Sequence, residues 1–270
     1  MRCCATGQRK SPRRGSKISV NFGKRLLGVI PARGGSKGIS GKNLRPFVGI
    51  PLIAHSVLFA KLCPEIDRCI VSTDSPEIAK VARSFGGEVP FMRPDELARD
   101  ETPMWPVLRH ALTSMEEAGK CQYDYLLLLD PTSPAREPSD VPEVLRRLVE
   151  CPSADGVIGV SQPDFNPIWH CVVEQDGWMV DLIKEGSEFD RRQDVRVVYR
   201  INGSIYIWRA DFVRREADSW RQHGKHIIYE IPEMRAMSID SIEEFKRAEV
   251  LVQSGLIKFP WLEGVRACVL

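Results

Sequence analysis

The sequence lacks the patterns that mark membrane, zinc and nucleic-acid proteins. No apolar run of the 270 residues approaches the roughly 20 that a membrane-spanning helix needs. The eight cysteines form no CxxC pair and the five histidines no HExxH pattern, so no zinc site is indicated. The net charge is only +2, and we expect neither nucleic acid nor a membrane as partner. Scattered cysteines are typical of reduced thiols, which favours a cytoplasmic protein.

The composition otherwise resembles that of a soluble globular protein, with 43% hydrophobic and 27% charged residues. We expect one domain over residues 25–262, a flexible basic extension over 1–24 and a short tail over 263–270. The extension has seven lysines and arginines and no acidic residue. It reads as a disordered tail or as the product of an upstream start codon. A targeting segment or a polyanion-binding arm is the alternative.

A basic, glycine-rich stretch follows the first apolar segment. Residues 26–30 read LLGVI, as in a strand buried on both faces of a parallel sheet, and residues 31–43 continue PARGGSKGISGKN. Glycines and consecutive backbone N–H groups form anion-binding loops, and Arg33, Lys37 and Lys42 add positive charge. The stretch matches neither the GxGxxG fingerprint nor the P-loop. It therefore predicts a phosphate-binding loop of another kind; the alternative is a solvated loop with incidental charge.

Strands and helices alternate from residue 26 to 160, which predicts a Rossmann-like, doubly wound and mostly parallel α/β sheet. The expected strands are 26–30, 68–72, 88–91, 123–129 and 156–160, and the expected helices are 51–62, 75–85, 102–115 and 141–149. Ligands of such sheets bind outside the carboxyl ends of the strands. The residues expected at this edge are Arg33, Lys37, Thr73, Asp74 and Asp130.

The pattern changes after residue 160. Residues 168–173 and 179–183 predict a β-hairpin, and a charged segment follows to residue 200. We interpret residues 161–200 as an insert that makes a subunit contact. Strands are expected again over 202–208 and 227–231. Ser241 and Glu244 then form a capping box at the start of a last helix.

Basic loop residues and acids at one sheet edge indicate a nucleoside triphosphate with a divalent cation. Carboxylates such as Asp130 and Asp240 could hold Mg²⁺ (or Mn²⁺) against the phosphates, and Asn43 could bind a phosphate or ribose oxygen. Positioning and charge stabilisation would then carry phosphoryl or nucleotidyl transfer. Each residue also has a structural interpretation: Lys42 as a solvated charge, Asp74 as a helix-capping acid and Asp240 as an acid preceding a helix.

The stretch PARGGSKG followed by Lys42, Asn43 and Leu44 resembles the signature of the acylneuraminate cytidylyltransferases. The resemblance covers about residues 26–256. Further matching segments are 71–74 (VSTD), 93–94 (RP), 131–134 (PTSP), 191–193 (RRQ), 202–204 (NGS) and 238–240 (SID). It implies a homodimeric enzyme that joins CTP to an acidic nine-carbon sugar with Mg²⁺ assistance, giving a CMP-sugar and pyrophosphate. The hairpin insert would reach into the neighbouring subunit's site.

The resemblance also implies roles for individual residues. The nucleotide would contact Arg33, Gly34, Ser36, Lys37, Lys42, Asn43 and Arg93. The sugar would contact Asp130, Arg192, Arg200 and Asn202. We expect Arg33, Lys37, Asp130 and Asp240 to be catalytic, with Asp240 and Asp130 as metal ligands.

The sequence departs from the family pattern mainly on the sugar side. Asp130 replaces a usual glutamine, Ser238 replaces the first of two usual metal acids, Trp169 stands near a usual lysine, and Met104 replaces a frequent hydroxyl residue. In one interpretation, Asp130 supplies the missing carboxylate. In the other, the acceptor has changed, to a legionaminic-type or amino-modified acid or a sugar phosphate.

Two other functions remain open at this point. A nucleotide-binding pseudoenzyme would keep the phosphate loop after losing a metal ligand, although the acid at position 130 argues against a pure binder. A nucleotidyltransferase of the same fold could also use another base and another sugar or sugar phosphate, because backbone recognition of a base leaves little trace in sequence.

Overall fold

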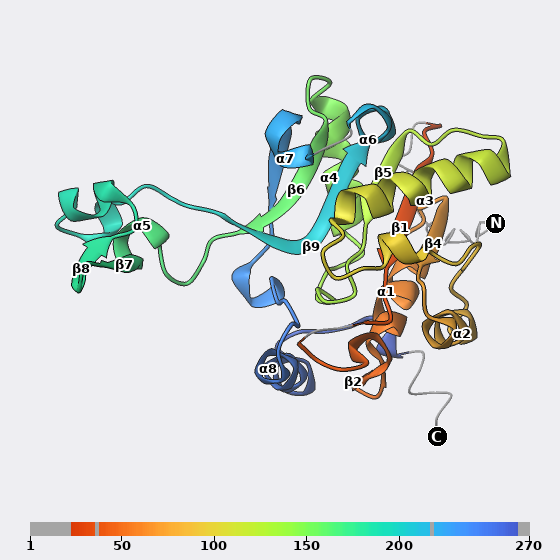
Figure 1. Ribbon diagram of the computed structural model, residues 1–270, viewed down its shortest axis with the longest axis horizontal. Coiled ribbons are helices and arrows are strands. Elements are labelled where there is room, and N and C mark those ends of the chain that lie inside the picture. Colours follow the sequence, from red (N-terminus) through yellow and green to blue (C-terminus); the bar gives the residue numbers. More distant parts are fainter. Residues whose placement is uncertain (1–22, 36–37, 217–218, 264–270) are drawn as a thin grey trace, which may run out of the picture.

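The computed structural model describes residues 23–35, 38–216 and 219–263 (Figure 1). Its centre is a six-stranded sheet in the order β10-β6-β9-β5-β1-β4. The strands are β1 (Leu26–Pro31), β4 (Arg68–Ser72), β5 (Tyr125–Leu128), β6 (Gly156–Ser161), β9 (Arg200–Arg209) and β10 (His226–Glu230). All neighbouring strands are parallel except β9, which runs antiparallel to β5 and β6. The predicted mostly parallel α/β sheet is confirmed.

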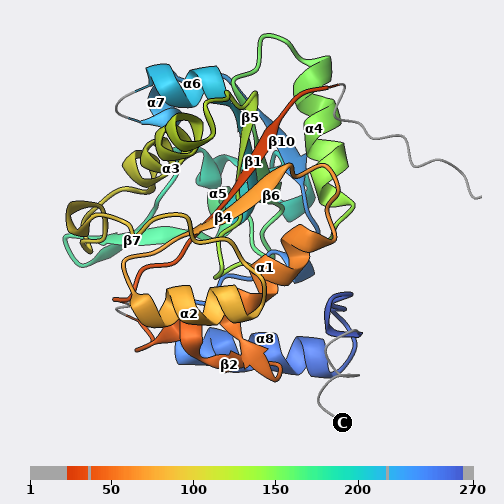
Figure 2. The ribbon, with the colours of Figure 1, turned by 90° about the vertical axis from the view of Figure 1, so that its right-hand side faces the viewer.

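Helices cover both faces of the sheet (Figure 2). The longer ones are α1 (Leu52–Lys61), α2 (Pro76–Ser84), α3 (Met104–Gly119), α4 (Asp140–Glu150) and α8 (Ile242–Gln253). The shorter ones are α5 (Pro167–His170), α6 (Ala210–Arg215) and α7 (Trp220–His223). Side chains alternate between faces along each strand, so Leu26 and Ile30 join the core under α1, α4 and α8, whereas Leu27 and Val29 join the core under α3 and α6.

Local signals place several helix starts where the sequence predicts them. Ser75 caps α2 by accepting a hydrogen bond from the backbone of Ile78 at 3.3 Å. Ser241 and Glu244 form the predicted capping box of α8. Within the described ranges, no helix is long and apolar enough to cross a membrane.

Two predicted elements differ. The segment 88–91 is not a strand. Glu88 forms an isolated parallel bridge to Ile70 of β4, and Met92, just beyond the segment, forms another to Thr73. Pro90 between them lacks an N–H group and interrupts the ladder. The hairpin consists of β7 (Val172–Gln175) and β8 (Trp178–Asp181), because Asn166 caps a helical turn, α5, where a strand was expected to begin at residue 168.

The segment between β6 and β9 projects from the body as an arm that carries α5, β7 and β8 (Figure 1). Two further short strands, β2 (Pro46–Phe47) and β3 (Ile50–Pro51), form a small antiparallel pair before α1. The predicted basic extension lies in residues 1–24 and the tail in 263–270, mostly outside the described residues.

Candidate active site

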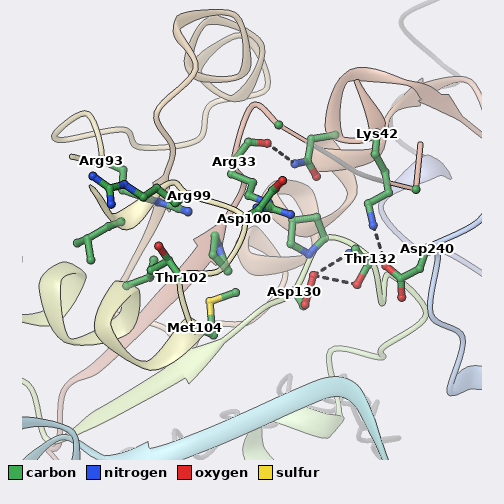
Figure 3. Close-up of a pocket in the computed structure, with 17 residues that line it drawn as sticks. Arg33, Lys42, Arg93, Arg99, Asp100, Thr102, Met104, Asp130, Thr132 and Asp240 are labelled. Carbon is green, nitrogen blue, oxygen red and sulfur yellow. Dashed lines mark hydrogen bonds and ion pairs between the residues drawn. The ribbon is translucent and has the colours of Figure 1, made fainter. Parts of the chain in front are cut away.

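A cavity of about 520 Å³ opens at the carboxyl ends of β1 and β5 (Figure 3). Four segments line it: the glycine-rich loop after β1, the segment between Arg93 and α3, the turn after β5, and Asp240 before α8. Its polar and charged lining residues are Arg33, Lys42, Asn43, Arg93, Arg99, Asp100, Thr102, Asp130, Thr132 and Asp240. Of the residues expected at this edge of the sheet, Arg33 and Asp130 line the cavity, whereas Thr73 and Asp74 do not and Lys37 lies outside the described residues.

Side-chain hydrogen bonds to its backbone hold the glycine-rich loop in place. The backbone N–H of Gly34 donates to Asp74 at 3.0 Å, and the side-chain amide of Asn43 donates to the carbonyl of Arg33 at 3.2 Å. Asp74 thus orients the loop, whereas Asn43 both braces it and lines the cavity. The predicted phosphate contacts Ser36 and Lys37 lie outside the described residues.

Lys42 and Asp240 form the loop's contact with the segment before α8. Lys42 Nζ, on a side chain only 12% exposed, donates to Asp240 Oδ1 and to the Ile239 carbonyl, each at 2.8 Å. Ser238 Oγ donates to Asp240 Oδ2 at 2.7 Å. Burial by itself would raise the pKa of Asp240, but the hydrogen bonds from Lys42 and Ser238 outweigh it, so this pKa lies below its ordinary value. Asp240 is therefore ionised at neutral pH.

The same contact depends on a glycine. A Cβ atom on Gly38 would lie 2.0 Å from the backbone oxygen of Asp240. No real side chain tolerates such a distance, so the loop can approach the acid this closely only without a side chain at position 38.

Asp130 stands at the start of the turn after β5. Its Oδ1 accepts hydrogen bonds from the backbone and hydroxyl of Thr132 at 3.0 and 2.9 Å. The buried Arg136 binds the carbonyls of Asp130 and Ser133 from inside the protein. The Ile239 N–H donates to the Thr132 carbonyl at 2.9 Å. The turn that carries Asp130 and the segment that carries Asp240 are therefore directly joined.

These two carboxylates suit a cation that is held mainly by substrate. Mg²⁺ in nucleotide enzymes takes one or two carboxylates, with phosphate oxygens and waters completing its coordination. Both Asp130 and Asp240 line the cavity. The described residues contain no group of three or more histidines, cysteines or acids that could form an all-protein metal site. The donor set thus fits a phosphate-bound Mg²⁺.

Arg93 forms part of the cavity wall. Its guanidinium is buried and donates to the hydroxyl of Ser72 at 3.1 Å and to the Ser72 carbonyl at 2.5 Å. Burial lowers its pKa to about 10, although Asp74 partly opposes this shift. Arg93 therefore stays charged at neutral pH.

The sequence did not single out the segment 99–102, which adds Arg99, Asp100 and Thr102 to the cavity. Asp100 forms an ion pair with Arg33, with 2.5 Å between Nη1 and Oδ1. The charged run Arg99–Asp100–Glu101, which begins five residues after Pro94, was the available signal. Only the folded chain shows which cation they face.

The residues predicted to bind sugar lie apart from this cavity, with the exception of Asp130. Arg200 pairs with Glu233 and donates to the Ala236 carbonyl at 2.7 Å, beside a second cavity of about 750 Å³. Asn202 is buried, and its side-chain oxygen accepts from the Ser204 N–H at 3.1 Å. Arg192 lies on the arm and donates to the Asp164 carbonyl at 3.1 Å.

Of the two remaining departures from the family pattern, Met104 lines the cavity and Trp169 does not. Met104 begins α3, and Trp169 belongs to α5 at the base of the arm. That Met104 and Trp169 lie near the bound sugar stays a prediction.

Comparison with known proteins gives a consistent result. The model of a family described as cytidylyltransferase matches residues 27–257. The post-translational flagellin modification protein B of Campylobacter coli is 36% identical over 229 residues, which are 84% of this chain and 95% of that protein. The CMP-N,N'-diacetyllegionaminic acid synthase of Legionella pneumophila is 37% identical over 191 residues, 68% of this chain and 77% of that one.

The fold also matches solved structures. A CMP:2-keto-3-deoxy-manno-octonic acid synthetase complexed with CTP aligns with a TM-score of 0.65 at 18% identity, over 86% of this chain and all of that one. At this identity the likeness concerns the fold alone. The family match over residues 27–257 and the relatives at 36% and 37% identity show that the chain belongs to the cytidylyltransferase family and is a nucleotidyltransferase of the acylneuraminate type.

Proposed function

We propose that the protein transfers CMP from CTP to a nonulosonic acid. The anomeric hydroxyl oxygen of the sugar attacks the α-phosphorus, the bond to the bridging oxygen of the β-phosphate breaks, and pyrophosphate leaves while the hydroxyl proton passes to solvent. The family membership supports this reaction, and one observation on the chain itself carries it. A single cavity gathers Arg33 and Lys42 with two carboxylates, Asp130 and Asp240.

We assign the cations of this cavity to the phosphates and its carboxylates to the metal ion. Arg33, Lys42 and the loop backbone would neutralise the triphosphate and stabilise the charge that develops on the leaving pyrophosphate. Asp130 and Asp240 would hold Mg²⁺ or Mn²⁺, which when bound to the phosphates supplies further positive charge at the reacting centre. The hydrogen bond between Ile239 and Thr132 supports this assignment, because it keeps the two carboxylate-bearing segments together.

For the acceptor we favour an N,N'-diacetylated acid of the legionaminic type. Relatives from Legionella pneumophila and Campylobacter jejuni that are 37% and 36% identical are named for that product. An N-acylneuraminate cytidylyltransferase from Escherichia coli is 33% identical over 183 residues.

We also propose that the enzyme is a homodimer in which the arm completes the neighbouring site. The arm exposes large apolar side chains, above all Trp178 and Met179, which are 76% and 77% exposed. Such a patch on a projecting hairpin favours a protein contact. A partner's Arg192 would then be available to a sugar bound next to Asp130.

The test is pyrophosphate release with each of CTP, GTP, UTP and ATP against N,N'-diacetyllegionaminic, N-acetylneuraminic and pseudaminic acids and a hexose 1-phosphate. We expect release with CTP and a nonulosonic acid, and a product with the mass of the corresponding CMP-sugar. Release only with another nucleotide or with the sugar phosphate would contradict the proposal. Tight CTP binding without release under any condition would favour the pseudoenzyme.

A further inference from the structure

Two cations of the candidate site, Lys42 and Arg33, form ion pairs with carboxylates. Lys42 pairs with Asp240, which belongs to the predicted metal side. Arg33 pairs with Asp100, which has no role in the proposed reaction. Asp100 lies in the segment that follows the 3-10 turn Asp95–Leu97 and leads to α3, and it lines the cavity. Its carboxylate oxygen Oδ1 lies 2.5 Å from Arg33 Nη1, so it holds a guanidinium N–H that a phosphate oxygen would otherwise accept from.

The surroundings explain why a carboxylate is needed there. Arg33, Arg93 and Arg99 all line the cavity, and Figure 3 shows them grouped on one side, with Lys42 on the other. Arg33 and Arg93 are close enough to repel each other, and Arg99 adds a third positive charge to the same cavity. A bound triphosphate would remove this repulsion. Within the described part of the chain, Asp100 is the acid paired with Arg33.

We infer that Asp100 is an internal competitor of the nucleotide phosphates: it holds Arg33 in the free enzyme, is displaced when the triphosphate binds, and returns as pyrophosphate leaves. This inference rests on the proposed phosphate-binding role of Arg33. It assigns to Asp100 a part in setting phosphate affinity and product release, without contact with the reacting atoms.

The size of the effect follows from the exposure of the pair. The side chains of Arg33 and Asp100 are 29% and 45% exposed, so solvent screens their attraction. Pairs of this kind change an equilibrium constant by at most about fivefold. Such a contact is strong enough to compete with a product and weak enough for a triphosphate to displace.

The experiment measures binding of inorganic pyrophosphate by calorimetry, in chelator and without nucleotide or sugar. We expect Asp100→Asn and Asp100→Ser to bind pyrophosphate about two- to fivefold more tightly than the wild type. Glu101→Gln, the matched control, removes the same charge from the neighbouring position, which does not line the cavity, and should not change the affinity. In an Arg33→Gln background, Asp100→Asn should have no effect.

Several outcomes overturn the inference. Weaker pyrophosphate binding by both Asp100 variants would show that Asp100 supports Arg33. Unchanged binding would show that Asp100 has no effect on phosphate affinity. If Glu101→Gln raises the pyrophosphate affinity equally, or if Asp100→Asn still raises it in the Arg33→Gln background, the change in affinity comes from the lower net negative charge alone. Absence of pyrophosphate binding by the wild type and both Asp100 variants also overturns it. Because no turnover is involved, the result stands apart from the test of the transferase reaction.

Discussion

The backbone N–H of Ile239 donates a hydrogen bond of 2.9 Å to the carbonyl oxygen of Thr132. This bond joins the turn after β5 to the segment before α8, two regions far apart in the sequence. Each partner stands beside a carboxylate of the cavity: Thr132 binds Asp130 through its hydroxyl, and Ile239 precedes Asp240. The bond therefore supports the idea that position 130 replaces the acid missing at Ser238.

If Asp130 is a metal ligand, Asp130→Asn will lower kcat by about 100-fold, a loss typical for removing one electrostatic group from a transferase site. Raising the Mg²⁺ concentration will restore part of this activity, because the remaining ligands bind the ion more weakly. Initial rates over a Mg²⁺ titration test this. An Mg²⁺ dependence identical to that of the wild type contradicts the assignment and favours a role of Asp130 in acceptor choice.

Ser238→Asp should rescue the Asp130→Asn variant. Ser238 Oγ lies 2.7 Å from Asp240 Oδ2, so an acid at this position would place a second carboxylate next to the first. We expect the double variant to recover about tenfold in activity over Asp130→Asn. Ser238→Ala is the control, since it removes the hydroxyl without adding charge. Equal recovery by Ser238→Ala shows that charge is irrelevant.

Gly38→Ala should weaken nucleotide binding. The added methyl would lie 2.0 Å from the backbone oxygen of Asp240, so the loop and the Lys42–Asp240 contact must separate. A misplacement of this size can cost about 100-fold in kcat/KM for CTP. Gly35→Ala is the matched control in the same loop, because a Cβ there meets nothing within 4 Å. Similar losses of kcat/KM for both variants would indicate that the effect comes from reduced loop flexibility and not from this contact.

Stability should fall as the pH is lowered from about 6.5 to 4, because of His55. This buried ring contacts the Phe47 carbonyl at 2.8 Å through Nε2 and accepts from the Trp261 indole N–H at 3.0 Å through Nδ1, an arrangement that needs the neutral ring. Burial lowers the pKa of His55 to about 4. The unfolded chain binds the proton first as the pH falls, so up to about 3 kcal/mol of unfolding free energy is lost across this window.

Denaturant unfolding at pH 7, 6, 5 and 4 measures this loss. His55→Gln should be less stable at pH 7 and should show a flatter pH dependence below 6.5. His223→Gln changes an exposed histidine and should keep the wild-type slope. If His55→Gln keeps that slope too, other groups cause the pH dependence.

Trp178→Ser should shift the protein towards monomers and lower its activity if the arm forms the proposed dimer. The indole is 76% exposed in the single chain, and large aromatic side chains often dominate the energy of interfaces. Light scattering with size-exclusion chromatography measures the mass. Leu256→Ser, also an exposed apolar position but beyond α8, is the control. A wild type that is monomeric at assay concentration and fully active contradicts the proposal.

Local chemistry explains which elements the sequence predicts well. The strand at residues 26–30 and the capping box at Ser241 depend on neighbouring residues only. The family resemblance, carried by the motif after β1, is confirmed by the family match. The individual site roles stay predictions, although the structure gathers Arg33, Lys42, Asp130 and Asp240 around one cavity.

The rest depends on contacts that no local pattern encodes. Apolar residues at 88–91 suggested a strand, but Pro90 leaves only isolated bridges. At Ile168 a cap-and-proline signal outweighed the apolar pattern. The Arg33–Asp100 pair joins residues 67 positions apart, and nothing in either neighbourhood specifies the other.

The point at which the arm leaves the body also bears on how this family can diversify. The chain departs at the end of β6 and returns at the start of β9, and these strands lie side by side, with Ser161 opposite Arg200. An arm of any length or shape can begin and end at this pair of strand ends without changing the register of the sheet. Selection could therefore remodel the arm, and whatever it touches, while the catalytic body is inherited intact.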